Sequence, residues 1–133
     1  MAPREEKNVV FWSGVKAEQD YLKDKYSDYR WMDVSRKTWE YWCHKNDVIF
    51  VPYEKPLMSD DLVTHRVNWQ RWFDVHKILE SKSIKYDQIL MTDASIMVRW
   101  DAPNFFNLTD RKVCALPSIE NYNWVYESVT GYQ

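Results

Sequence analysis

The chain has 133 residues, enough for one domain with one hydrophobic core, and a formal net charge of −2 at pH 7. Acidic and basic residues are interspersed along it without the basic stripe of a nucleic-acid-binding protein, which argues against that class although aromatic residues make up 17% of the chain. With 2 glycines, the sequence holds neither a glycine-rich phosphate loop nor a dinucleotide fingerprint. P-loop enzymes and Rossmann dehydrogenases are thereby excluded.

The sequence predicts a soluble, cytoplasmic protein. No apolar run reaches the roughly 18 residues of a membrane span, and the first residues carry no apolar signal region. Cys43 falls on an expected buried helical face, so Cys43 and Cys114 are predicted to be reduced thiols rather than a disulfide. The three histidines lack metal-ligand spacing, and Cys43 and His44 point about 100° apart on a helix, which argues against a zinc site.

The first half of the chain predicts strands alternating with helices. Asn8 begins a short apolar run that Gly14 closes, typical of a central strand, and Trp39, Trp42 and Cys43 have helical spacing. In chain order we expect a strand over 8–13, a helix over 16–26, a strand over 29–32, a helix over 34–45 and a strand over 47–52.

The second half continues this alternation. We expect a loop over 53–64, a long helix over 66–82, a strand that ends at Asp93, a helical turn over 102–106 and a strand over 112–116. One face of the long helix is predicted to carry Trp69, Trp72, Phe73, His76 and Leu79. This order implies an α/β fold with a mainly parallel sheet, helices on both faces and a single domain spanning 1–133.

The most informative segment is the apolar run 89–98, which Asp93 and Ser95 interrupt. Ligands of open α/β sheets bind at the carboxyl ends of the strands, where Asp93 is expected. Two oxygen ligands at this spacing suit a divalent cation, so Asp93 and Ser95 are the candidate metal ligands. The alternative is that Asp93 only caps the turn after its strand.

Other candidates have equally simple structural alternatives. Phe11, Trp12 and Ser13 end the first strand and are candidates to frame a nucleobase, or else belong to the core. Asp33 is a candidate acceptor for a base imino group, or else the N-cap of the helix over 34–45.

Basic residues of the long helix are candidates to contact a diphosphate: Arg66, Arg71 and Lys77. A solvated face is the favoured alternative for Arg71. An ion pair with Asp74, three residues earlier, is the favoured alternative for Lys77.

The element order and the segment 86–98 resemble the nucleotide-sugar-binding half of a GT-A glycosyltransferase, closest to the fungal galactosyl- and mannosyltransferase type. In that type a strand runs into Asp-x-Asp followed by apolar residues. The resemblance implies a GT-A-like fold and a minimal glycosyltransferase that binds a nucleoside-diphosphate sugar, a UDP-sugar, through Mn²⁺ or Mg²⁺. The sugar would pass to a hydroxyl of an unknown acceptor.

On the matching positions, the resemblance implies that Asp93 holds the ribose or the metal and that Ser95 replaces the second Asp. It also implies that Phe11, Trp12, Ser13 and Asp33 surround the base. Because Ser95 is neutral, we expect weaker metal affinity than the family pattern gives.

The chain ends at Gln133, where a GT-A enzyme continues into its acceptor-binding half, so we expect the aromatic segment 122–127 to form the acceptor wall and transfer to be slow. Asp101, Glu120 and Glu127 are the candidates for a catalytic base, and the stereochemical outcome stays open. The alternative function is a non-catalytic nucleotide-sugar-binding or protein-interaction module, and a homo-oligomer is compatible with either.

Overall fold

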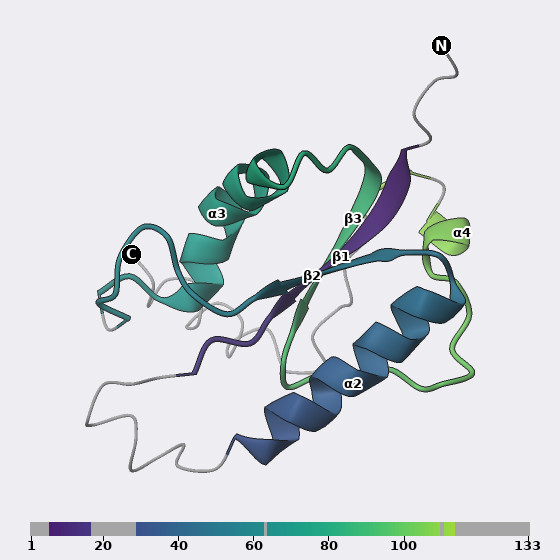
Figure 1. Cartoon of the computed structure of the whole chain (residues 1–133), viewed down its shortest axis with the longest axis horizontal. Helices are drawn as coiled ribbons and strands as arrows, with labels where there is room; N and C mark the ends of the chain where they lie inside the picture. The colour runs from purple at the N-terminus through teal and green to yellow at the C-terminus, as the bar shows by residue number, and fades with distance from the viewer. Residues whose placement is uncertain (1–5, 17–28, 63, 110, 114–133) are drawn as a thin grey trace, which may run out of the picture.

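The computed structural model describes residues 6–16, 29–62, 64–109 and 111–113 and shows a small α/β fold. Three parallel strands form an open sheet in the order β2-β1-β3: β1 (Lys7–Ser13), β2 (Ile49–Tyr53) and β3 (Tyr86–Asp93). Helices α2 (Arg30–Lys45) and α3 (Val67–Ser81) cover opposite faces of the sheet, and the short helix α4 (Phe106–Thr109) follows β3 (Figure 1). The predicted α/β class with a parallel sheet is confirmed.

The predicted strands over 8–13 and 47–52 and the strand ending at Asp93 are confirmed. The strand predicted over 29–32 is wrong, because α2 already begins at Arg30. Met32 is buried in line with Ser35 and Trp39, and this helical spacing extends the helix toward its N-terminus. Tyr29 occupies the N-cap position without a side-chain hydrogen bond, so the N-cap alternative for Asp33 is wrong as well.

Parts of the prediction lie outside the described residues. Residue 16 is not helical, and the rest of the helix predicted over 16–26 is outside the described ranges. Of the strand predicted over 112–116, residues 112 and 113 are not in a strand and the others are outside. The turn predicted over 102–106 is displaced toward the C-terminus, because α4 begins at Phe106, whose N–H donates to Asn104 Oδ1 at 3.1 Å.

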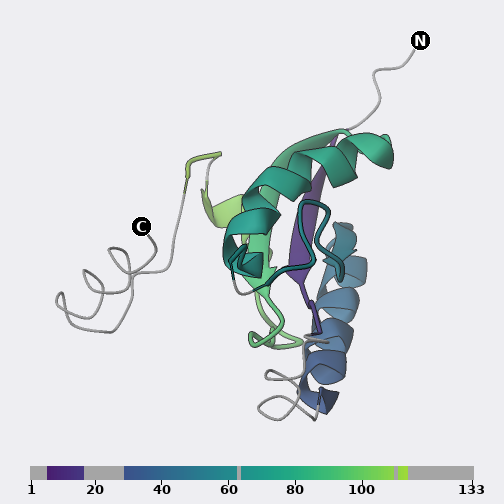
Figure 2. The same cartoon turned by 90° about the vertical axis from the view of Figure 1, so that its left-hand side faces the viewer.

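The sheet separates two apolar layers, seen in Figure 2 with β1 between α3 and α2. On the α2 side, Val10 and Trp12 pack against a buried helix stripe that includes Trp39 and Trp42. On the α3 side, Val9 and Phe11 lie with Val51, Tyr53, Val75 and Leu79. Successive strand residues therefore alternate between the layers, as a pleated strand buried on both faces requires.

Of the residues predicted to share one face of α3, Leu79 is buried, whereas the aromatic residues are exposed. Trp69, Trp72 and Phe73 are 50%, 57% and 61% exposed, on the outer side of the helix. The buried residues are Gln70, Asp74, Val75 and Leu79. The helix is thus rotated relative to its aromatic stripe, because buried polar side chains hold the preceding loop, as described below.

Cys43 is a free thiol buried in the α2 layer, as predicted. Burial raises its pKa to about 12, with a smaller contribution from the nearby charge of Glu40. None of the helices in the described ranges is both long enough and apolar enough to cross a membrane.

Candidate functional site at the carboxyl edge of the sheet

The three strands end level with one another. In the strand register, Ser13 is the partner of both Tyr53 on β2 and Asp93 on β3. Since these residues follow the α3-side members Phe11, Val51 and Met91 by two positions, all three side chains face α3. The strand order changes sides at β1, and the ends of β1 and β3 are where the topology of such a sheet predicts a ligand.

Arg71 of α3 reaches these strand-end residues and forms an ion pair with Asp93 through Nη1 and Oδ1. The side chain of Arg71 is 17% exposed and that of Asp93 is 43% exposed, so the pair lies at the boundary between core and solvent. Arg71 Nε is buried and has no hydrogen-bond partner among the described residues. Ser13 Oγ, on a residue that is 6% exposed, is likewise unpaired within the described ranges.

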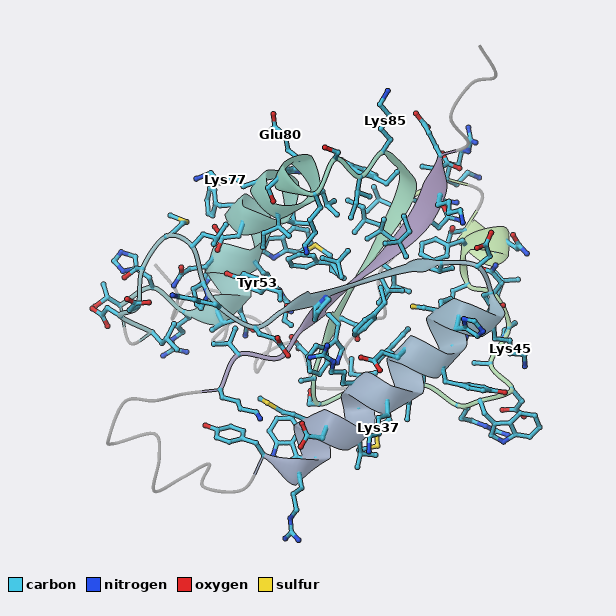
Figure 3. The ribbon with its side chains drawn as sticks, in the orientation of Figure 1. Lys37, Lys45, Tyr53, Lys77, Glu80 and Lys85 are labelled. Atoms are coloured by element: carbon cyan, nitrogen blue, oxygen red, sulfur yellow. The ribbon has the colours of Figure 1, made fainter. Side chains whose placement is uncertain are left out.

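Tyr53 lies between β2 and α3 (Figure 3), and its hydroxyl donates a hydrogen bond to Asp74 Oδ2. The same oxygen accepts from the Leu57 backbone N–H at 2.9 Å. Burial, followed by this hydrogen bond to Asp74, raises the pKa of Tyr53 well above its ordinary value. Asp74 is fully buried, and its Oδ1 has no partner among the described residues.

The loop between β2 and α3 is held by two side chains one helical turn apart, Gln70 and Asp74. The Gln70 amide accepts from Ser59 N–H at 3.1 Å and donates to the Ser59 and His65 carbonyls at 3.0 and 2.6 Å. Together with the Asp74 bond to Leu57, these contacts supplement the backbone hydrogen bond of the loop from His65 N–H to the Asp61 carbonyl at 2.9 Å. The loop is therefore fixed where it borders the carboxyl edge.

The segment after Asp93 is fixed from the opposite layer. Asp93 starts a turn in which its carbonyl accepts from Ile96 N–H at 3.1 Å. The Ile96 carbonyl then accepts from Ser35 Oγ at 2.6 Å and from Trp39 Nε1 at 3.0 Å. Ser35 Oγ also accepts from Trp12 Nε1 at 3.0 Å, so one hydroxyl connects the end of β1 to the turn that follows β3.

A hollow of about 590 Å³ opens beyond the ends of β1 and β2. It is lined by a mixture of apolar and charged residues: Val15, Lys16, Glu54, Lys55, Pro56, Asp60 and Leu62. Lys16 Nζ lies 4.0 Å from Asp33 Oδ1, which places Asp33, exposed in the first turn of α2, beside this hollow. The hollow is large enough for a small ligand.

Of the predicted base-binding residues, Ser13 is at the edge and Asp33 is near the hollow, whereas Phe11 and Trp12 are core residues. Phe11 stacks on Tyr53 with ring centroids 5.2 Å apart, and Trp12 contacts Phe50 at 6.1 Å on the other side of the sheet. Both are buried, so neither ring offers a face to a nucleobase in this arrangement. Their strand-end position does not bring them together, because adjacent strand residues point to opposite faces.

Of the predicted diphosphate ligands, Arg66 is exposed at the N-cap of α3, and Lys77 is exposed on its outer side (Figure 3). Lys77 does not pair with Asp74, whose carboxylate points inward to Tyr53 and Leu57. Arg71 is the basic residue that α3 brings to Asp93. The solvated-face alternative for Arg71 is wrong.

The residues at Asp93 fit a divalent cation poorly. The Asp93 carboxylate is engaged by a guanidinium, and Ser95 is an exposed, neutral residue of the turn. Among the described residues, His, Cys, Asp and Glu form no group of three that could hold a metal. Hard cations of this kind favour several charged oxygens, whereas this set supplies one that already has a counter-charge. The metal site at Asp93 and Ser95 stays a prediction.

The sequence did not indicate Tyr53 and Asp74 as part of this site, and it gave Arg71 as a candidate diphosphate ligand with a solvated face as the favoured alternative. A usable signal was present: Gln70, Arg71, Asp74 and Val75 fall on one helical face. Because three of the four are polar, hydrophobic periodicity selected the aromatic face instead.

No family model, no curated protein and no solved structure matches the chain.

Proposed function

We propose that the chain binds a nucleoside-diphosphate sugar, with UDP as the nucleotide, at the carboxyl edge between β1 and β3 and transfers the sugar to an acceptor hydroxyl. The observation that carries this proposal is the Arg71–Asp93 ion pair beside the Ser13 hydroxyl, which has no hydrogen-bond partner among the described residues. A guanidinium, a carboxylate and a hydroxyl are the groups that recognise phosphate oxygens and sugar hydroxyls. They meet at the position where parallel sheets bind ligands.

Each group has a distinct part in this reaction. Arg71 stabilises negative charge on the diphosphate, Ser13 donates to a phosphate oxygen, and Asp93 accepts from a sugar or ribose hydroxyl. The bond between the anomeric carbon and the diphosphate oxygen breaks, and UDP leaves with the electron pair. The acceptor oxygen forms the new bond to the anomeric carbon and loses its proton to water. Asp101 is exposed and bonded to Arg99, whereas Glu120 and Glu127 lie outside the described residues.

Calorimetric titration with UDP tests donor binding, and release of UDP from a panel of UDP-sugars tests transfer. Arg71→Gln and Lys77→Gln form a matched pair, since each removes one positive charge from α3. We expect Arg71→Gln to weaken UDP binding by about tenfold or more, because a charge-assisted contact is lost. Lys77→Gln should bind as the unmodified chain does. Equal losses of UDP affinity in the two variants would mean that only the net charge of α3 matters, and this would contradict a binding site at Arg71.

Protein interaction is a second candidate function, favoured by the outer face of α3. Trp69, Trp72 and Phe73 are exposed there, and Trp69 and Phe73 line a hollow of about 290 Å³ together with Met58. Clustered exposed aromatic residues are typical of protein-binding surfaces. Sedimentation velocity over a range of concentrations tests self-association, and Trp72→Glu should abolish it. A monomer at all concentrations would exclude a homo-oligomer through this face.

A further inference from the structure

We infer that the Arg71 guanidinium supplies the positive charge that binds the diphosphate. Asp93 pairs with this guanidinium when no ligand is bound, and UDP binds without a divalent cation by opening the Arg71–Asp93 ion pair. This inference rests on the proposed function and specifies how the same site neutralises its ligand.

Arg71 has hydrogen-bond donors that Asp93 does not engage. Its guanidinium carries five N–H donors in a planar fork that matches phosphate oxygens. One nitrogen, Nη1, bonds Asp93, while Nε is buried without a partner among the described residues. A buried donor left unpaired is unfavourable, and a diphosphate oxygen would satisfy it once the ion pair opens and the guanidinium turns toward the ligand.

Ser13 offers a second donor on the same side of the sheet. Its hydroxyl is buried, unpaired within the described ranges, and on the register partner of Asp93. Both Ser13 and Asp93 face α3, so the unpaired hydroxyl lies on the side from which Arg71 approaches. A diphosphate has enough oxygens to accept from Arg71 and from Ser13 together. The Tyr53 hydroxyl already donates to Asp74 and is not needed.

The charge of the Arg71 guanidinium favours an anionic ligand over a cation at Asp93. A cation on Asp93 would have to displace Arg71 and would then lie beside a partly buried guanidinium of the same sign, which raises the electrostatic free energy. A diphosphate replaces one carboxylate charge with a greater negative charge and keeps Arg71 paired. Asp93 thus competes with the ligand for Arg71 and positions the side chain when the ligand is absent.

The test is calorimetric titration with UDP and with inorganic pyrophosphate, each in EDTA and in Mn²⁺, using the full chain and three variants: Arg71→Gln, Asp93→Asn and Lys77→Gln. The full chain should bind UDP in EDTA, with affinity within about threefold of that in Mn²⁺. Asp93→Asn should bind both probes in EDTA on the order of tenfold more tightly, because the competitor for Arg71 loses its charge while the Asn amide oxygen still accepts from a ribose hydroxyl. Arg71→Gln should lose binding in both media, and Lys77→Gln is the control.

The contrary results separate this inference from the proposed function. UDP binding only in Mn²⁺, abolished by Asp93→Asn, would overturn the inference, restore the cation site at Asp93 and leave donor binding intact. No UDP binding by the full chain in either medium would overturn both. If Asp93→Asn gained affinity for UDP but not for pyrophosphate, its effect would lie away from the phosphates, which also overturns the inference. Circular dichroism of Arg71→Gln checks its fold, and the result for Asp93→Asn stands without it.

Discussion

The two layers that cover the sheet are built from different chemistry. On the α2 side, Trp12, Trp39 and Trp42 fill the layer, and each indole N–H has a partner: Ser35, the Ile96 carbonyl and the Ala102 carbonyl. On the α3 side, charged residues enter the layer, and Arg71 Nε and Asp74 Oδ1 are unpaired together with Ser13 Oγ within the described residues. Thr92, two residues after Leu90 of the α2-side cluster, also has an unpaired buried hydroxyl, so the difference between the layers is that the unpaired charged groups of the described residues lie on the α3 side. The first layer is specialised for stability, whereas the second gives up stability to place charged groups at the carboxyl edge.

Trp42→Ala should have the largest effect and should be confined to stability. The Trp42 side chain is fully buried, stacks on Phe105 with centroids 5.1 Å apart and meets Trp39 at 5.7 Å. Losing a buried indole should lower the free energy of unfolding by about 3–5 kcal/mol. Urea denaturation measures the change, with Trp100→Ala on the exposed surface as a control below about 1 kcal/mol. If the folded Trp42→Ala variant lost UDP affinity, the assignment of stability to the α2 layer and of binding to the α3 layer would be wrong.

Asp74→Ala should be the most damaging change on the α3 side. It leaves the Tyr53 hydroxyl and the Leu57 N–H without their acceptor, and each unpaired buried group costs about 1–3 kcal/mol. The expected loss in the free energy of unfolding is about 2–4 kcal/mol, together with weaker UDP binding as the β2–α3 loop is released. Asp74→Asn keeps one acceptor oxygen and should lose less in both measurements. Identical results for the two variants would deny the role of the hydrogen bonds.

Alkaline pH should destabilise both layers. The folded chain keeps Cys43 and Tyr53 protonated because their pKa values are raised, whereas the unfolded chain ionises them near pH 9.0 and 10.0. Stability is therefore complete below pH 9 and falls as pH rises toward 12, by at most about 1.4 kcal/mol per pH unit for each group. Urea titrations from pH 7 to pH 11 measure this fall. Cys43→Ala should delay its onset to about pH 10, and an unchanged onset would remove Cys43 from the explanation.

Ser13→Ala should have the smallest effect on stability and the clearest effect on binding. Its hydroxyl is buried without a partner among the described residues, so its removal should change the free energy of unfolding by less than about 1 kcal/mol, toward greater stability. UDP affinity in EDTA should fall severalfold. A marked loss of stability would show that Ser13 has a structural partner and is not reserved for a ligand.

The sequence predicts much of the fold because β1, β2 and β3 are apolar runs bounded by turn residues, and Asp93 is the residue at which one run stops. It predicts less of the site, since the phase of α3 depends on tertiary contacts. Trp69, Trp72 and Phe73 outweigh Val75 and Leu79 in any hydrophobic pattern, yet Gln70 and Asp74 are buried because the loop needs their hydrogen bonds. The hydrogen bonds that Gln70 and Asp74 form with the loop backbone therefore set the rotation of α3 in place of its hydrophobic pattern. This rotation directs Arg71 toward Asp93.

The central place of β1 also affects how the chain is made. β1 is synthesised before β2 and β3, yet both of its hydrogen-bonding edges are filled only by those later strands. During translation its apolar residues, Val9 to Trp12, therefore have two open edges until β2 has left the ribosome and one open edge until β3 has followed. Non-local parallel pairing is slow, and unpaired apolar strands aggregate. Yield in a heterologous host should accordingly improve at reduced temperature and with added chaperones, which shield this strand while its neighbours are being synthesised.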